Sequence, residues 1–449
     1  MITLCATNVF AQGSTGLSLE EAVTQAVQRY PSVRVSQEQV SAAAAAIQLA
    51  RTAYLPRVDA IAGLNRATRN NSFGLLLPSQ VIAPISGPVL GTNDLTSVWG
   101  STVGVLASWE PFDFGLRRAN VAVAEATRAH AQTTVARTQF ELATLTADAF
   151  LTLIAAQETV RAGLAAIERA DVLVRTVDAL VRAELRPGAE LSRSRAEQAA
   201  ARTQLVRAEQ AVAEAKVTLG QLLGIDQNQV SALPGRLLDL PSENAGTAAE
   251  VANNPIAREQ VAVVDEAQAR LRALERSYAP RFALQGTVYA RGTGALSNGT
   301  TLGGANGLGP NVQNWAIGFT ATFPIFDLPS IRAREAAQSA TIRAEKNRYD
   351  LVLTELNGRI NAAKASLEGA KRVAQNTPVE VQSARAALQQ ASARYESGLG
   401  SVVEAADAQR LLAQAEIDDA LARLTVWRAQ LAVAAAQGDI TPVLRQAGR

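Results

Sequence analysis

Two carboxylates stand out in the stretch YESGLGSVVEAADA, residues 395–408. Glu404 and Asp407 lie three residues apart, just after a glycine-containing turn and inside an alanine-rich segment typical of a helix. Because residues i and i+3 share a helix face, the two side chains are expected to project together. The residues by themselves are compatible with a site built from carboxylates alone and with ordinary solvated acids beside Arg394 and Arg410.

Composition argues against most other chemistry. The chain has 449 residues and a formal net charge of +2, so nothing indicates a nucleic-acid partner. Its single cysteine, Cys5, and single histidine, His130, are too few for a metal site of such ligands or for a nucleophile–histidine pair. We expect His130 to be an ordinary residue of a helix surface. The sequence therefore predicts neither an enzyme nor a bound cofactor or metal.

The first residues, MITLCATNVFAQG, resemble the end of an export signal whose basic segment is missing. We expect residues 1–16 to be a leader whose true start lies upstream. Two fates of Cys5 stay open, namely removal with a leader cleaved after Ala11 and attachment of a lipid. No run of about 20 apolar residues occurs, so no transmembrane helix is predicted, and any membrane insertion must use strands.

An internal repeat organises the chain. YLPRVDAIAGL at 54–64 returns as YAPRFALQGTV at 278–288, and FDFGLRRA at 112–119 returns as FDLPSIRA at 326–333. The number of residues that separates matching segments falls along the chain. Ala196 aligns with Ala408, and this alignment predicts that the tight turn of the first repeat is two residues longer than that of the second. The predicted repeats span 17–224 and 245–437, with a linker at 225–244 and a tail at 438–449.

Each repeat is predicted to run helix, strand, loop, strand, long helix, tight turn, helix. Apolar residues recur every seven positions along the long helices, which predicts antiparallel coiled-coil packing. Ser18 and Glu21 form a capping-box pattern, and Pro378 is expected to kink the second long helix or to restart it with Thr377 as a cap. In the first repeat, the opening helix at 17–53 is followed by predicted strands 54–69 and 97–112 and helices 116–184 and 189–223. In the second repeat, the opening helix is followed by predicted strands 278–294 and 314–326 and helices 329–396 and 401–437.

The strands have one apolar face and one face of small or polar residues. In NWAIGFTATFPIF, apolar and small or polar residues alternate without a fault. Strands of about ten residues with this pattern are typical of transmembrane β-barrels, and a soluble sandwich is the alternative. Four strands cannot close a barrel, whereas three copies of the chain would supply twelve. Aromatic residues expected at the membrane interface are Trp99, Trp109, Trp315 and Phe323.

Over residues 17–437 the chain resembles the outer-membrane efflux protein family, the TolC-like exit ducts. The resemblance rests on the duplicated layout, on Tyr-x-Pro-Arg before each first strand, on PFDFG and FPIFD, and on the turns ELRPGAELSRSRAEQ and YESGLGSVVEAADAQ. It implies a mainly α fold with a membrane β-barrel portion, in which a homotrimer builds a twelve-stranded outer-membrane barrel over a periplasmic α-barrel.

The resemblance also implies a function, a location and partners. Such a protein is a passive duct of a tripartite efflux or type I secretion system in the outer membrane of a Gram-negative bacterium. It receives small molecules, metal ions or proteins from a periplasmic adaptor (membrane fusion) protein and an inner-membrane pump of the RND or ABC type. A coiled-coil adaptor or structural protein without a pore is the alternative, and the two-faced strands favour the duct.

The same resemblance assigns residues to the helix tips. Glu404 and Asp407 would form a cation-attracting ring at the periplasmic aperture, with Tyr395 and Ser192 at the constriction. The family's basic latch residue is replaced by Gly400, so we expect a closed resting state held by fewer salt links. Candidates to replace the latch are Arg186, Arg193 and Arg195. The residues expected to contact the adaptor are Arg186, Pro187, Gly188, Gly398, Leu399 and Gly400.

Overall fold

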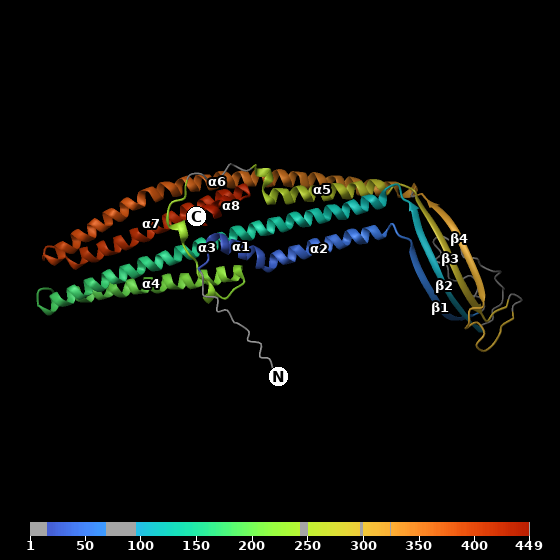
Figure 1. Cartoon of the computed structure of the whole chain (residues 1–449), viewed down its shortest axis with the longest axis horizontal. Helices are drawn as coiled ribbons and strands as arrows, with labels where there is room; N and C mark the ends of the chain where they lie inside the picture. The colour runs from blue at the N-terminus through green and yellow to red at the C-terminus, as the bar shows by residue number, and fades with distance from the viewer. Residues whose placement is uncertain (1–15, 69–95, 243–249, 297–299, 324, 449) are drawn as a thin grey trace, which may run out of the picture. The chain divides into compact units, whose positions relative to one another are not determined.

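The structure, a computed structural model, describes residues 16–68, 96–242, 250–296, 300–323 and 325–448 (Figure 1). The expected leader with Cys5 lies outside the described residues, as does most of the loop after the first strand. The chain divides into two compact units. The helix-tip unit comprises residues up to 39, 131–261 and 347–449, and the sheet unit comprises 40–130 and 262–346.

Two helices replace the single opening helix expected at 17–53. They are α1 (Leu19–Arg29) and α2 (Pro31–Thr52), which are separated by Tyr30 in extended conformation. The break follows from Pro31, which disfavours a helical conformation in the residue before it and is well placed at the start of a new helix. The capping box is confirmed, because Glu21 N donates to Ser18 Oγ while Ser18 N donates to the Glu21 carboxylate.

Long helices dominate the rest of the chain. They are α3 (Leu116–Arg182), α4 (Gly188–Leu223), α5 (Pro255–Arg276), α6 (Leu328–Glu396) and α7 (Val402–Gln437). α3 has 67 residues and α6 has 69, so each is about 100 Å long at 1.5 Å per residue. α6 continues through Pro378 without restarting. Thr377 donates to Asp419 on α7 at 2.8 Å, so it pairs two helices and does not cap one.

The tail is helical, which the sequence did not predict. α8 (Thr441–Gly448) buries Val443, Leu444 and Ala447 in the main core of the helix-tip unit. The same core contains the middle of α3, the end of α4, α1 and part of the linker. The linker forms short 3-10 helices at Gln227–Gln229 and Gly235–Leu238, and another at Val251–Asn253 precedes α5. Trp427 of α7 fastens the linker by donating its indole N–H to Asp239 O at 2.8 Å.

One described helix departs from the expectation that no helix suits a membrane. α3 is long enough and apolar enough to cross one by length and composition, with a mean hydropathy of 1.3 in its most apolar 18 residues. Its apolar side chains also have a packing role, because Phe150, Leu153 and Ile154 are fully buried in the core of the helix-tip unit.

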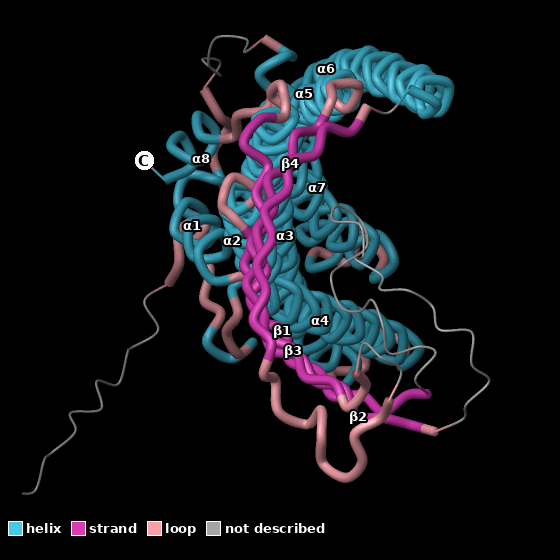
Figure 2. The backbone as a smooth tube through the Cα atoms, turned by 90° about the vertical axis from the view of Figure 1, so that its right-hand side faces the viewer, coloured by secondary structure: helices cyan, strands magenta, loops and turns pink. Residues whose placement is uncertain are grey.

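A four-stranded antiparallel sheet forms in the order β1-β2-β3-β4 (Figure 1), and its strands are magenta in Figure 2. The strands are β1 (Arg57–Thr68), β2 (Ser97–Phe112), β3 (Arg281–Thr293) and β4 (Val312–Thr322). Val105 pairs with Val288 and Val288 with Trp315, so the alternating apolar residues align across the sheet. This two-faced sheet beside long helices confirms the predicted fold class.

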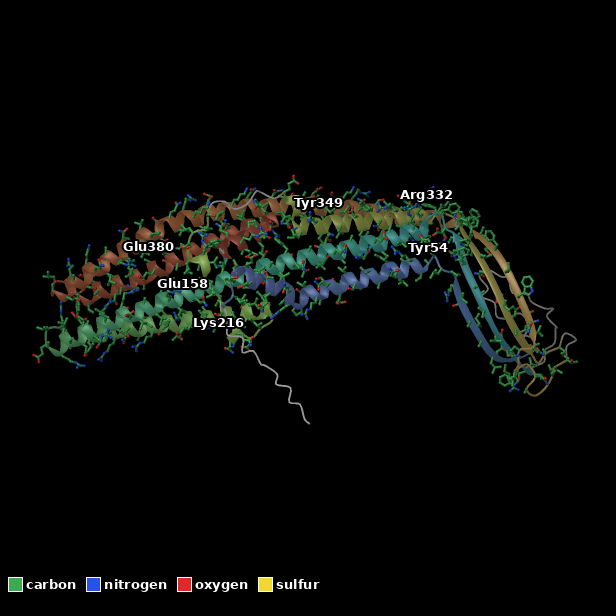
Figure 3. The ribbon with its side chains drawn as sticks, in the orientation of Figure 1. Tyr54, Glu158, Lys216, Arg332, Tyr349 and Glu380 are labelled. Atoms are coloured by element: carbon green, nitrogen blue, oxygen red, sulfur yellow. The ribbon has the colours of Figure 1, made fainter. Side chains whose placement is uncertain are left out.

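The repeated Tyr-x-Pro-Arg and PFDFG motifs meet where the helices join the sheet. Tyr54, between α2 and β1 (Figure 3), accepts a 3.1 Å hydrogen bond from the Trp109 indole through its carbonyl oxygen. The Arg117 guanidinium lies 4.9 Å from the centre of the Tyr54 ring and 2.9 Å from Asp113. In the second repeat the Tyr278 hydroxyl donates to Glu335 at 2.8 Å. The motifs therefore fasten the strands to the helices.

Candidate functional site

The two helix tips have the same backbone design. Glu184 N donates to Val181 O and Leu185 N to Leu180 O, and in the second repeat Gly398 N donates to Tyr395 O and Leu399 N to Arg394 O. Each is a helix C-terminus closed by a residue in the left-handed conformation. The next helices begin at Gly188 and Val402, which are as many residues apart as Glu184 and Gly398. The two turns therefore have the same length. The expectation of a longer first turn is therefore wrong.

This correspondence reveals a residue that the sequence reasoning missed. Leu185 is the counterpart of Leu399, and the two side chains are 70% and 76% exposed at the ends of their hairpins. Glu184 occupies the place of Gly398 with φ of +57°. Because a glycine usually fills this position, the glutamate concealed the match. FDFGLRRA and its counterpart FDLPSIRA are separated by the same number of residues as the two helix tips. This separation was the signal in the sequence that could have found Leu185.

A buried tyrosine joins the two hairpins. The Tyr395 hydroxyl, on α6, donates to the Glu190 carboxylate on α4 at 3.0 Å. The Arg186 guanidinium lies 5.0 Å from the centre of the Tyr395 ring and donates to the carbonyl oxygens of Tyr395 and Gly400 at 3.3 and 3.2 Å. We call Tyr395, Glu190 and Arg186 the tip lock. It links α3–α4 to α6–α7 through charge-assisted hydrogen bonds.

The tip lock is largely shielded from water. Tyr395 is 2% exposed and packs among Val177, Val402 and Ala405. Its burial and its hydrogen bond to Glu190 raise the pKa of the Tyr395 hydroxyl to about 12, against the opposing effect of Arg186. The hydroxyl is therefore a proton donor at any physiological pH.

The structure places Tyr395 inside the chain and brings one latch candidate, Arg186, beside its ring. With 2% exposure, the ring fills the contact between hairpins and does not line an opening of this chain. Arg186 is the repeat counterpart of Gly400, so the basic residue absent from the second tip is present at the same position of the first. The carboxylate belongs to Glu190, while Ser192 is exposed and donates only to Gly188 O of its own helix.

The other candidate arginines lie elsewhere. Arg195 is 3.7 Å from Asp178, within its own hairpin, and Arg193 is exposed. Among the described ion pairs, none joins the two hairpins at their tips; the pair between them that lies nearest the tips along the helices is Arg169–Glu416, at 2.8 Å. Arg385 approaches Glu416 to 3.8 Å, so this carboxylate contacts α3 and α6 from α7.

Glu404 and Asp407 are accessible, with side chains 53% and 51% exposed. Ser401 caps α7 by accepting from Glu404 N, which places the carboxylate in the first turn, where the helix dipole favours negative charge. Each carboxylate has an arginine beside it: Arg410 Nη2 is 2.7 Å from Asp407, and Arg394 Nε is 3.9 Å from Glu404. The two side chains lie on one helix face as expected.

The apolar face of the sheet is exposed in the single chain. Its members on β4 are Trp315, Ile317 and Phe319, which are 64–77% exposed. Trp109 is 41% exposed and Phe323 60%, whereas Trp99 is half-buried beneath Arg66, whose guanidinium lies 5.3 Å from the ring. Trp315 is not at a strand end as expected, because β4 begins at Val312, which pairs with Arg291.

His130 is more than a surface residue. Its Nδ1 lies 2.8 Å from Glu266 on α5, which also accepts from Thr127 at 2.9 Å. Burial opposes ionisation of Glu266, but the hydrogen bonds from His130 and Thr127 prevail and lower its pKa. The contact binds α3 to α5. No group of three or more His, Cys, Asp or Glu side chains that could hold a metal occurs among the described residues.

A family profile described as "Outer membrane efflux protein" matches residues 22–225 and 249–439. The chain belongs to this family. The two matched segments correspond to the two repeats, so the duplicated layout is a family property. The protein is thus an exit duct for efflux in the outer membrane of a Gram-negative bacterium, extending into the periplasm. This outcome confirms the resemblance and sets aside the coiled-coil adaptor without a pore.

Named relatives are similar over much of the chain. The pyoverdine export outer membrane protein OpmQ of Pseudomonas aeruginosa is 24% identical over 405 residues, which cover 89% of this chain and 79% of the relative. OpmQ of Pseudomonas putida is 26% identical over 65% of this chain and only 60% of its own length, less than two thirds. The cobalt-zinc-cadmium resistance protein CzcC of Cupriavidus metallidurans is 28% identical over 68% and 69%.

The fold is also that of solved channels. The Campylobacter jejuni CmeC outer membrane channel superposes with a TM-score of 0.75 at 16% identity, over 98% of this chain and 94% of the channel. At this identity the match establishes the shared fold and not the cargo.

Proposed function

We propose that three copies of this chain form a passive duct that carries cargo from a periplasmic adaptor through the outer membrane. The observation that carries this proposal is the sheet with one exposed apolar face and with two edges, β1 and β4, that pair with no other strand among the described residues. Hydrocarbon cannot hydrogen-bond an unpaired strand edge, so the sheet must close with sheets of other copies. Three four-stranded sheets give twelve strands, an even number within the range of known barrels.

The helix tips are proposed as the periplasmic entrance. Glu404 and Asp407 are accessible there, and the tip lock holds the two hairpins of each chain together. Opening by separation of the hairpins would break the bond between Tyr395 and Glu190. We therefore propose that the tip lock stabilises the closed entrance with hydrogen bonds, in line with the expectation of fewer salt links.

Adaptor and pump are proposed as partners. Leu185 and Leu399 are the most exposed apolar side chains of the two turns, and they offer the adaptor apolar contacts beside Pro187, Gly188 and Gly398. Arg186 is mostly buried in the tip lock, with its side chain 19% exposed, so it contributes less to docking than its position in the turn suggested. The pump is proposed to be of the RND or ABC type.

The cargo class is left broad by the relatives, because OpmQ is named for pyoverdine export and CzcC for resistance to cobalt, zinc and cadmium. A small-molecule or metal-ion efflux role is therefore favoured over protein secretion for this chain.

The duct is tested with paired substitutions on the two faces of β4. Ile317→Arg places a charge on the proposed lipid face, and Thr320→Arg places it on the opposite face. A midplane arginine on a lipid face costs about 2–4 kcal/mol. We expect Thr320→Arg to reach the outer membrane as a trimer with channel activity in planar bilayers, and Ile317→Arg to assemble poorly. Equal assembly of both variants, or a wild-type trimer without conductance, would contradict the proposal.

A further inference from the structure

The charges at the helix tips are balanced within one chain. Residues 182–197 contain four arginines and three acidic residues, and residues 394–410 contain two arginines and three acidic residues. The two tips together are therefore neutral at pH 7, with six charges of each sign. A ring that attracts cations, as the carboxylates alone suggested, does not follow from this balance.

Arg410 is the arginine best placed to alter the field at the entrance. Its Nη2 atom lies 2.7 Å from Asp407 Oδ1, one turn further along the same helix. The side chains are 70% and 51% exposed, so both charges face solvent. Arg394 is a weaker counter-charge for Glu404, at 3.9 Å. Arg410 also lines a groove between α3, α4 and α7, whose lining includes Glu197 of α4.

An exposed ion pair adds little to stability, but it does change the local charge. An ion about 10 Å away experiences nearly the sum of the two charges, because the charged atoms are only 2.7 Å apart. That distance is comparable to the Debye length at 0.1 M salt, so the field is screened only in part. Arg410 thus cancels most of the field of Asp407 at the place where a solute would enter.

We propose that Arg410 determines the ionic selectivity of the entrance by neutralising Asp407, an inference that rests on the proposed duct. With this pair in place the entrance discriminates little by charge and passes anionic and zwitterionic solutes as readily as cations. Charge at the entrance then does not select the cargo, and the entrance is not a filter specific for metal cations.

The proposal is tested by the reversal potential of single channels in a KCl gradient. Wild type is expected to show a K⁺/Cl⁻ permeability ratio near unity. Arg410→Gln removes three positive charges from a trimer, and three unit charges at about 10 Å in water, screened over one Debye length, change the ratio about five-fold toward K⁺. Arg410→Lys keeps the charge and is expected to resemble wild type. A strongly cation-selective wild type, or an unchanged ratio in Arg410→Gln, would overturn the proposal.

Asp407→Asn gives a second, independent reading and decides the matter where Arg410→Gln fails to assemble. If Arg410 faces the entrance, loss of its partner leaves three unpaired positive charges and the channel becomes anion-selective. If Asp407→Asn channels show no anion preference, Arg410 does not act there and the proposal is wrong. Absence of channels from every assembled trimer, wild type included, would instead refute the duct itself.

Discussion

Replacing Tyr395 with phenylalanine should weaken the contact between the two hairpins without disturbing its packing. The substitution removes one atom from a ring that is 2% exposed and leaves its apolar surroundings intact. What is lost is the 3.0 Å hydrogen bond to the Glu190 carboxylate. A hydrogen bond to a charged partner contributes about 1.5–3 kcal/mol.

That free energy converts directly into an opening equilibrium. Since 1.4 kcal/mol corresponds to a factor of ten, the open state should gain about ten- to 100-fold in population relative to the closed state. Glu190 and Arg186 remain close to each other, at 3.8 Å, so part of the lost stabilisation of the carboxylate is recovered. The lower half of the range is therefore the better expectation.

The assay is the open fraction of single channels of the purified trimer in planar bilayers, for wild type, Tyr395→Phe, Glu190→Gln and the double variant. Because the two single substitutions remove the same bond, their effects should combine far less than additively. Tyr349→Phe, on the same helix (Figure 3), is the matched control, since its hydroxyl makes no hydrogen bond to another described residue. An unchanged open fraction in Tyr395→Phe, or strict additivity with Glu190→Gln, would refute the tip lock.

Three further predictions concern the same unit. The pKa of Tyr395 is about 12 in the folded protein against about 10 for an unfolded tyrosine, so the protonated hydroxyl contributes about 2–3 kcal/mol to the free energy of unfolding below pH 10, and this contribution is lost as the pH rises to 12. The difference in unfolding free energy between wild type and Tyr395→Phe, measured with denaturant, should therefore shrink between pH 10 and pH 12. A constant difference would be the contrary result. Glu184→Gly should stabilise the first turn by about 0.5–1 kcal/mol in thermal unfolding, because glycine accepts the φ of +57° without strain, whereas Gly398→Ala should destabilise the second; a destabilised Glu184→Gly would show that the glutamate side chain has another role. Glu416→Gln should lower the free energy of unfolding by about 1–2 kcal/mol, because Glu416 joins α3, α6 and α7 at a half-exposed junction. Its effect should add to that of Tyr395→Phe, since the two sites share no partner. Non-additive effects would indicate that the two contacts open together.

The elements could be predicted from the sequence because their signals are local. The alternation in NWAIGFTATFPIF and the seven-residue period of the long helices depend on neighbours within a few turns. Some errors have local causes as well. Pro31 divided a helix that composition alone made continuous. The helix in the tail was not predicted, because its apolar residues are held by tertiary contacts with the core of the helix-tip unit. Pro378 was expected to interrupt α6 and does not.

The candidate site was only half predictable. The exposed carboxylates Glu404 and Asp407 follow from the turn and the helix after it, since capping by Ser401 fixes the direction of the first turn. Glu190 was missed because the alanine-rich helices allow several alignments of the two halves, and the alignment chosen from sequence directed attention to Ser192. Backbone hydrogen bonds at the turns fix the alignment without ambiguity.

The sequence by itself determined the duplication, the long helices and the two-faced strands, because periodicity and turn residues act within one segment of chain. Only the tertiary structure decided that Tyr395 is buried, that Arg186 covers it and that Glu190 accepts its hydrogen bond. Tyr395 belongs to one repeat and its two partners belong to the other, and a hydrogen bond between them depends on the angle and register at which two helical hairpins pack. No local pattern encodes that register, since it results from the fit of many small side chains along the whole contact.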